Sequence, residues 1–462
     1  MKILFVIYDN GSYMSFFPQG VAYISAALKN TGIDVKIYNQ DLYHYPEEHL
    51  TDYLDKNYFD VVGLGVIGGY YQYRKLLAIS KAINKSKNRP YYILGGHGPS
   101  PDPEYFIRKT GANAIVIGEG EVTIVELMNA VSKNHDLADI KGIAYRDGNT
   151  VKVNPRRELI EDVDNIKMPA YELFPIEIYR LRREANCQVT DFVMPVLSGR
   201  GCTFKCNFCY RMDKGFRPRS AESIIQEIHF LNKKYGINYI YFSDELLMSS
   251  VERTEDLCKA FIKSKLDFHW WCNGRLNYAK PDLLKLMKKA GCVFINYGIE
   301  SFDNEALKNM NKALNTKQIV SGVNATLKAE ISPGLNIIWG NIGENARTLR
   351  QSVDFLKKYG DASQMRTIRP VTPYPGSPLY YYAIEKGLLR DCKDFYENKH
   401  LNSDLLAVNF TDLSDEEFYK ELHQANLELI DDYYMKRKKM TYEDAEKLYV
   451  KQNTNFRGFR QV

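Results

Sequence analysis

Three cysteines, Cys202, Cys206 and Cys209, stand in one short run with the spacing C-x3-C-x2-C. Thiolates are good ligands for iron–sulfur clusters, and a closed zinc site or a stored cluster usually takes four protein ligands. A four-iron cluster held by only three cysteines keeps one iron open to a small molecule. The spacing therefore predicts an iron–sulfur centre that binds and activates a ligand. A zinc site completed by a distant cysteine or histidine is the alternative.

Strands that alternate with helices surround these cysteines, which predicts a parallel sheet. Six such units are fewer than the eight of a complete TIM barrel, so we expect a partial, open (β/α)6 barrel. Barrel enzymes bind their ligands at the carboxyl ends of the strands, and the cysteine loop follows the first strand directly. The expected strands are residues 194–198, 239–243, 269–272, 293–298, 334–339 and 367–370.

A second set of alternating strands and helices precedes the barrel and predicts a doubly wound, Rossmann-like parallel sheet. Glycine-rich turns follow four of its strands, where glycine lets a bulky ligand approach the backbone. Tight strand-to-helix turns without a ligand are the alternative. None of the turns is G-x-G-x-x-G or a phosphate loop, which argues against nicotinamide cofactors and nucleoside triphosphates. The expected strands are residues 2–8, 34–38, 61–66, 91–94 and 114–117.

The α/β chain is expected to divide into four parts. The Rossmann-like sheet forms the first, a hairpin around Asp147-Gly148 and a proline-containing linker the second, and the barrel the third. The fourth is helical, because Ser414 and Glu417 form a capping-box signature ahead of a polar amphipathic stretch that we expect to pack on the barrel. The expected boundaries are residues 1–140, 141–189, 190–390 and 391–462.

The composition of the 462 residues is that of an ordinary globular protein, with 45% hydrophobic and 26% charged residues. The 62 basic and 57 acidic residues are too balanced to indicate a nucleic-acid partner. No apolar run approaches the ~18 residues of a membrane span, and no secretory signal is present at the start. The eight cysteines do not resemble a disulfide framework, so a reducing cytoplasm is the expected location.

The cysteine run resembles the signature of the radical S-adenosylmethionine (SAM) enzymes, and further motifs over roughly residues 190–390 match that family. One departure is the turn Gly340-Asn341-Ile342-Gly343-Glu344, which has Asn-Ile where Leu-Pro is usual. The resemblance implies that SAM binds the open iron of a 4Fe–4S cluster and yields a 5′-deoxyadenosyl radical. Ordinary hydrogen bonding at the barrel rim is the alternative role for the two glutamates and the arginine among the matching residues. The implied SAM-binding residues are Phe208, Glu245, Arg275, Glu300 and Ser301.

The first 140 residues resemble the cobalamin-binding module that precedes the barrel in one large subgroup of this family. Asp-x-His-x-x-Gly is absent, so the resemblance implies that no histidine binds cobalt from below. The same absence allows a domain that has lost cobalamin, and a lone turn histidine also fits a structural role. The implied cobalamin-binding residues are Gly11, Gly20, Gly65, Gly68, Gly95, Gly96, His97, Gly118 and Glu119.

The two resemblances together imply a cobalamin-dependent radical SAM enzyme that methylates an unactivated carbon. Cyclisation, ring rearrangement, carbon–carbon coupling and dehydration are alternatives on the same architecture, and a carrier without turnover is a third. The implied partners are a small-molecule or natural-product substrate and an electron donor such as flavodoxin or ferredoxin. The 34 tyrosines and 22 phenylalanines either fill the cores or line a roomy site.

Overall fold

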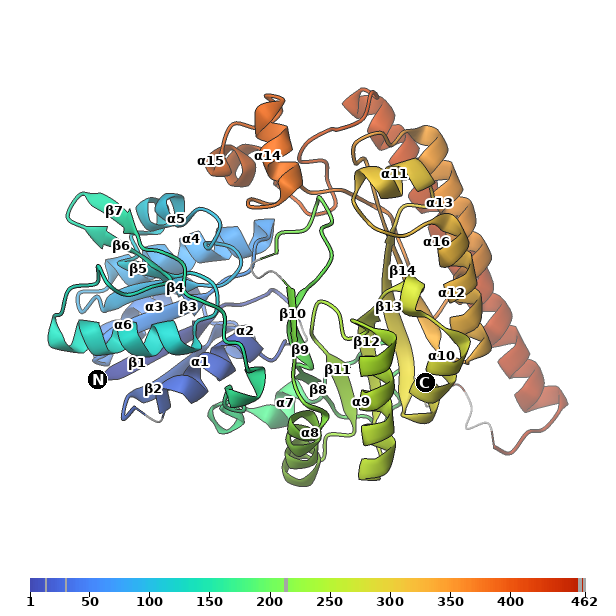
Figure 1. Ribbon diagram of the computed structural model, residues 1–462, viewed down its shortest axis with the longest axis horizontal. Helices are drawn as coiled ribbons and strands as arrows, with labels where there is room; N and C mark the ends of the chain where they lie inside the picture. The colour runs from blue at the N-terminus through green and yellow to red at the C-terminus, as the bar shows by residue number, and fades with distance from the viewer. Residues whose placement is uncertain (13–14, 30, 212–214, 456–458, 460–462) are drawn as a thin grey trace.

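The computed structural model describes residues 1–12, 15–29, 31–211, 215–455 and 459. Its N-terminal part is a seven-stranded sheet with the order β2-β1-β3-β4-β5-β6-β7, in which β1 to β5 are parallel (Figure 1). Strands β1, β3, β4 and β5 are apolar runs buried on both faces, as expected of a parallel sheet, while the edge strand β2 alternates exposed and buried residues over its first half. The strands are β1 Lys2–Ile7, β2 Asp34–Asn39, β3 Val61–Gly65, β4 Tyr91–Gly95, β5 Ala114–Val116, β6 Ile143–Asp147 and β7 Thr150–Val153.

Helices cover both faces of this sheet, which confirms the doubly wound prediction. One face packs its apolar side chains against α1 and α6, and the other packs against α3, α4 and α5. The predicted hairpin is also present, because β6 and β7 pair antiparallel at the sheet edge. The helices are α1 Gln19–Lys29, α2 Gln40–Tyr43, α3 Glu47–Lys56, α4 Tyr70–Lys85, α5 Pro103–Thr110, α6 Glu121–Lys133 and α7 Ile176–Tyr179, with short 3-10 turns at Val163–Asn165 and Tyr171–Leu173.

The second sheet has six parallel strands in the order β15-β14-β13-β12-β11-β8. Its first and last strands in sequence, β8 and β15, stand at opposite edges, so the sheet is an open partial barrel as predicted. The strands are β8 Val193–Val196, β11 Tyr239–Phe242, β12 His269–Gly274, β13 Cys292–Glu300, β14 Ser332–Trp339 and β15 Arg369–Pro370. The helices around it are α8 Ala221–Tyr235, α9 Val251–Ser264, α10 Pro281–Lys289, α11 Asn304–Asn309, α12 Thr316–Lys328 and α13 Ala346–Tyr359, with a 3-10 turn at Leu276–Tyr278.

A two-stranded antiparallel hairpin, which the sequence pattern did not predict, flanks the cysteine loop. Its strands are β9 Gly199–Cys202 and β10 Gly215–Pro218. The first strand reads Gly-Arg-Gly-Cys and lacks the alternation of apolar and polar residues that identifies a strand in a sequence. In Figure 1 the hairpin lies between the two large sheets.

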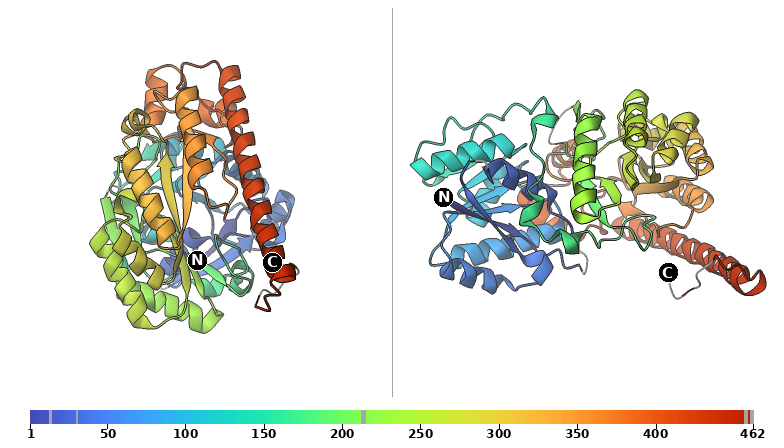
Figure 2. Two further views of the ribbon diagram at one scale, coloured as in Figure 1. Left: turned by 90° about the vertical axis from the view of Figure 1, so that its right-hand side faces the viewer. Right: turned by 90° about the horizontal axis from the view of Figure 1, so that it is seen from below.

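The C-terminal region is helical, as predicted, but it packs in two places. Helix α14 and the turns after it add apolar side chains to the core of the N-terminal sheet. The 31-residue helix α16 instead packs on the barrel, where Phe418 stacks on Trp339 with ring centroids 4.1 Å apart, and its far end projects from the body (Figure 2). The elements are α14 Pro378–Glu385, α15 Cys392–Asp394, a π turn Phe395–Lys399, α16 Asp415–Ala445 and a π turn Glu446–Val450.

Among the described residues, no helix has the length and apolar character needed to cross a membrane.

Candidate functional site

The three cysteines lie in the loop that begins at the end of β9. Cys202 is the last residue of β9, Cys206 is 8% exposed, and all three thiols are free of disulfides. Burial raises the pKa of Cys209 to about 11, and the neighbouring Cys206 and Cys202 act in the same direction. Thiols in this state bind iron only after they lose their protons, so iron binding would have to offset the burial. No three His, Cys, Asp or Glu side chains of the described part converge tightly enough to bind one metal ion.

Asn207, between two of the cysteines, ties this loop to the rest of the barrel. Its side chain exchanges two hydrogen bonds with the amide of Asn341, each 3.0 Å long, in the turn after β14. Its backbone N–H donates to Met310 O at 3.0 Å, and its carbonyl accepts from the N–H of Leu379 at 2.8 Å. The loop is therefore fixed from three sides. Sequence reasoning missed this role of Asn207, although the unusual asparagine in the turn after β14 was a visible sign of it.

Two of the expected SAM-binding residues are buried beside the cysteine loop. Arg275, only 7% exposed, places its guanidinium 3.4 Å from the ring centroid of Phe204. Burial lowers the pKa of this arginine, and the nearby Cys206 opposes that change. Glu300 has a left-handed φ of 71° at a bulge in β13, and its Oε1 accepts from Lys312 Nζ at 2.9 Å. A charged pair therefore lies under the loop.

The other three expected SAM-binding residues differ in their surroundings. Ser301 is fully buried, and its hydroxyl lies against the Glu344 carboxyl, where its hydrogen bond lowers the pKa of that group against the larger effect of burial. Glu245 is exposed, and its charge raises the pKa of both Cys202 and Cys209, behind the larger effect of burial. The Phe208 ring lies 5.8 Å from Lys312 Nζ. All five expected residues therefore border the loop or the strand ends beside it.

The glycines expected to bind cobalamin occupy the carboxyl edge of the N-terminal sheet, after β1, β3, β4 and β5, or the start of α1. Gly96 has a φ of 96°, and a Cβ there would lie 2.5 Å from Val66 O, so the turn itself requires glycine. A Cβ at Gly118 or Gly20 would meet nothing within 4 Å. The remaining members are Gly11, Gly65, Gly68 and Gly95. A Cβ at Gly11 would lie 2.7 Å from the Tyr71 hydroxyl, and one at Gly68 would lie 3.2 Å from the Tyr396 hydroxyl. At Gly65 and Gly95 the nearest atoms, of Val21 and of Val116 O, would each be 3.7 Å away.

This glycine edge meets the cysteine loop. The ring of His97 makes an edge contact with the ring of Tyr210, with centroids 6.2 Å apart, and Tyr210 directly follows Cys209. A Cβ at Gly376, in the proline-rich turn after β15, would lie 2.5 Å from the same tyrosine ring. The carboxyl ends of the two sheets therefore face one another across the cysteine loop.

Glu119 binds two arginines of the β9–β10 hairpin. Its carboxylate accepts from Arg200 and from Arg217, each at 2.9 Å, and also from the backbone N–H of Ile160 at 2.8 Å. Although burial opposes it, the hydrogen bonds from the two arginines lower the pKa of this carboxyl. Arg200 also pairs with Glu121. A residue expected to touch cobalamin thus connects its domain to the strand that ends at Cys202.

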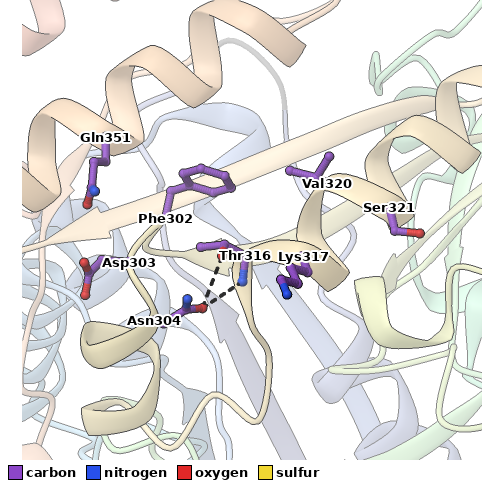
Figure 3. Close-up of a pocket in the computed structure, with 8 residues that line it drawn as sticks. All are labelled: Phe302, Asp303, Asn304, Thr316, Lys317, Val320, Ser321 and Gln351. Carbon is purple, nitrogen blue, oxygen red and sulfur yellow. Dashed lines mark hydrogen bonds between the residues drawn. The ribbon is translucent and has the colours of Figure 1, made fainter.

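A separate hollow of about 550 Å³ opens on the outside of the barrel beside α11, α12 and α13 (Figure 3). The Asn304 side chain accepts hydrogen bonds from the backbone N–H and the hydroxyl of Thr316 across its floor. None of the expected site residues lines it. The lining residues are Phe302, Asp303, Asn304, Thr316, Lys317, Val320, Ser321 and Gln351.

Comparisons with known proteins support the division into two sheets. The profile of the Radical SAM superfamily matches residues 196–356, and that of the B12 binding domain matches residues 11–128. The chain is 30% identical to an uncharacterised methyltransferase of Pyrococcus horikoshii over 377 residues, 80% of this chain and 79% of the relative. It is also 27% identical to an anaerobic magnesium-protoporphyrin IX monomethyl ester cyclase of Rubrivivax gelatinosus, over 82% of this chain and 69% of the relative.

Among solved structures, the fold is similar to that of the radical SAM methyltransferase TsrM of Kitasatospora setae. The TM-score is 0.73 at 17% identity, and the match covers 93% of this chain and 88% of TsrM. That structure contains cobalamin and a 4Fe–4S cluster.

Proposed function

Because the chain belongs to the radical SAM enzymes that carry an N-terminal B12-binding domain, we propose that it uses their three cofactors to methylate an unactivated carbon. The cofactors of this family are a 4Fe–4S cluster, SAM and cobalamin. When bound, the cluster and SAM supply a carbon radical, and cobalamin supplies the methyl group. The meeting of the glycine edge with the cysteine loop is the observation that carries the proposal.

We assign the cluster to Cys202, Cys206 and Cys209. Their three free thiols share one loop, and Asn207 anchors that loop to neighbouring turns. Arg275 lies close to Cys206, which raises the pKa of the arginine against the larger effect of burial. The guanidinium therefore places a positive charge where the thiolates would form. At Cys202 that charge opposes the rise in pKa that burial causes, and so favours the thiolate that binds iron.

We assign SAM to the strand ends beside this loop. Phe208 offers an aromatic face, Glu300 a carboxylate and Ser301 a buried hydroxyl. Glu245 and Arg275 complete the expected set from the ends of β11 and β12.

We assign cobalamin to the glycine edge of the N-terminal sheet. Gly118 and Gly20 leave space where a side chain would stand, and parallel sheets bind ligands at this edge. His97 reaches from that edge to Tyr210 and so lies between the two proposed cofactor sites. Substrate would bind where both edges are within reach, enclosed from water by the two domains.

The test is anaerobic turnover of reconstituted enzyme with cobalamin, SAM, a reductant and candidate small molecules. Methylation through both cofactors predicts two products from SAM, 5′-deoxyadenosine and S-adenosylhomocysteine. Formation of 5′-deoxyadenosine alone would contradict methylation. It would support the non-methylating chemistry that the cyclase relative represents. Cys206→Ala is the control, because loss of one cluster ligand should remove both products.

The physiological reductant is expected to be a small electron donor such as flavodoxin or ferredoxin. Its identity is read from the same assay, because the physiological donor should support turnover at micromolar concentration.

A further inference from the structure

Lys312 lies where three of the proposed SAM-binding residues meet. Its Nζ donates to Glu300 Oε1 at 2.9 Å and stands 5.8 Å from the centroid of the Phe208 ring. Its backbone carbonyl accepts a hydrogen bond from Arg275 Nη2. One residue therefore contacts side chains from the cysteine loop, from the end of β12 and from the end of β13.

The backbone around Lys312 is strained. Asn311 before it and Ala313 after it have φ values of 53° and 50°, in the left-handed region. Asparagine tolerates this region, but alanine is rarely found there, because its Cβ crowds the following carbonyl. Such strain persists where the surroundings hold the chain firmly, and it concentrates at functional sites. The two left-handed residues fix the direction in which the Lys312 side chain leaves the backbone.

The same turn supports the cysteine loop. The carbonyls of Asn309 and Met310 accept hydrogen bonds from the side chain and the backbone of Asn207, at 3.1 and 3.0 Å. The N–H of Lys312 closes the turn on Leu307 O at 2.9 Å. One short segment, residues 309–312, thus holds both the lysine and the cysteine loop, and their relative position is fixed.

Burial makes the Lys312–Glu300 pair costly to break. The two side chains are 8% and 12% exposed, and no other carboxylate of the described residues lies within ion-pair distance of the lysine. The bond uses Oε1 of Glu300, while Oε2 makes no hydrogen bond within the same part of the chain. Removal of the lysine would leave this carboxylate buried without a cation beside it. The lysine therefore pairs one oxygen of Glu300 and leaves the other for a ligand.

We propose that Lys312 is a positioning residue for SAM, which holds Glu300, Arg275 and Phe208 in the arrangement that receives the ligand. This rests on the proposed function, because it takes these three residues as SAM contacts. Lys312 acts through Glu300 in particular, so its removal should weaken SAM binding without removing the cluster.

The test is SAM affinity, measured by equilibrium dialysis on anaerobically reconstituted, cobalamin-loaded enzyme with its iron content checked. Loss of one buried charge-assisted contact should raise the dissociation constant of Lys312→Met roughly 10- to 100-fold. Lys312→Arg should recover most of the affinity, since it restores the cation. Lys308→Met is the matched control, because that lysine is exposed on the same segment and should leave affinity unchanged.

A double-mutant cycle separates positioning from a direct contact. In the Glu300→Gln background, adding Lys312→Met should change affinity little if the lysine acts through the glutamate. Wild-type affinity in Lys312→Met, or fully additive effects in the cycle, would overturn the inference. Lys312→Met could lose its cluster or fail to fold. In that case the SAM affinity of Glu300→Gln/Lys312→Met, which buries no unpaired charge, is compared with that of Glu300→Gln alone. Absence of SAM binding in wild type would instead contradict the proposed function.

Discussion

The cysteine loop depends on single amide side chains that a motif search does not detect. Asn207 and Asn341 each donate to and accept from the other, and both are almost fully buried. A buried amide that loses its partner costs more than the hydrogen bond it made, because the remaining group cannot return to water. The turn after β14 has Asn341 where leucine is usual, and the buried amide of this asparagine is paired by Asn207 in the cysteine loop that the turn supports.

Asn341→Leu should destabilise the protein by about 1–3 kcal/mol, because it leaves the Asn207 amide partly unpaired. The effect should appear as a lower melting temperature and as faster loss of iron from the reconstituted enzyme. Asn207→Leu/Asn341→Leu removes both amides, so it should lose less than the two single effects added together. An unchanged iron-loss rate in Asn341→Leu would contradict this view of the loop.

Glu344, three residues further along the same turn, predicts a pH dependence. Burial raises its pKa from 4.5 to about 8, although hydrogen bonds from the Asn341 backbone and the Ser301 side chain act in the opposite direction. Between pH 4.5 and 8 the folded state keeps a proton on Glu344 that the unfolded state has released. The contribution of this group to the free energy of unfolding therefore falls as the pH rises through that range. Each unit of difference between the two pKa values changes the free energy of unfolding by at most about 1.4 kcal/mol.

The melting temperature should accordingly drop more between pH 6 and pH 8 in wild type than in Glu344→Gln, which cannot ionise. Thermal scans of the two apo proteins across that range measure the difference. Parallel curves would show that Glu344 ionises in the folded state much as it does in water.

At the scale of elements, the β9–β10 hairpin joins the two domains. Glu119 precedes helix α6 and Glu121 begins it, while Arg200 and Arg217 stand on the two strands of the hairpin. The four side chains are between 7% and 16% exposed, so their charges are poorly screened by water. A shift of the turn after β5 would therefore be transmitted to the strand that ends at Cys202.

Arg200→Met should loosen the hairpin, because it leaves two mostly buried carboxylates with one arginine. We expect a loss of roughly 3 kcal/mol and faster backbone hydrogen exchange in residues 199–202 and 215–218. Arg108→Met is the matched control, since its pair with Glu104 is half exposed and should contribute less than about 1 kcal/mol. Equal exchange in the two variants would show that the ion pairs do not order the hairpin.

The elements with a strong apolar pattern could be predicted from the sequence, and those without it could not. All strands of the two parallel sheets lie within a few residues of their expected positions, because long buried runs leave little choice of structure. The β9–β10 hairpin depends on contacts across the cysteine loop and has no local signal. The roles of Lys312 and Asn207 also escaped prediction, since they arise from contacts that form only in the folded chain.

At the scale of the whole molecule, the segment after the barrel returns to the N-terminal domain. The ring of Tyr396 stacks on Tyr73 of α4 with centroids 4.7 Å apart, and Glu397 accepts from the hydroxyls of Tyr73 and Tyr105. The hydroxyl of Tyr396 also approaches Gly68 on the glycine edge. This segment therefore contributes to both the core and the glycine edge of a domain more than 300 residues earlier in the sequence.

Tyr396→Ala should cost about 3–5 kcal/mol, because it leaves a cavity between the segment and α4. The loss should fall on the N-terminal domain, and limited proteolysis should cut the released segment first. Tyr381→Ala, which removes a 57% exposed ring from α14, should have little effect. Loss of barrel stability alone in the Tyr396 variant would contradict the placement of this contact.

The shared core has a consequence for the order in which the protein can mature. One apolar face of the N-terminal sheet is completed by Tyr380, Leu389, Phe395 and Val408. The barrel must therefore be synthesised before these side chains can join those of α3, α4 and α5 on that face. Cobalamin, whose proposed edge includes Gly68 beside Tyr396, would then be loaded late, onto a chain that has already closed on itself.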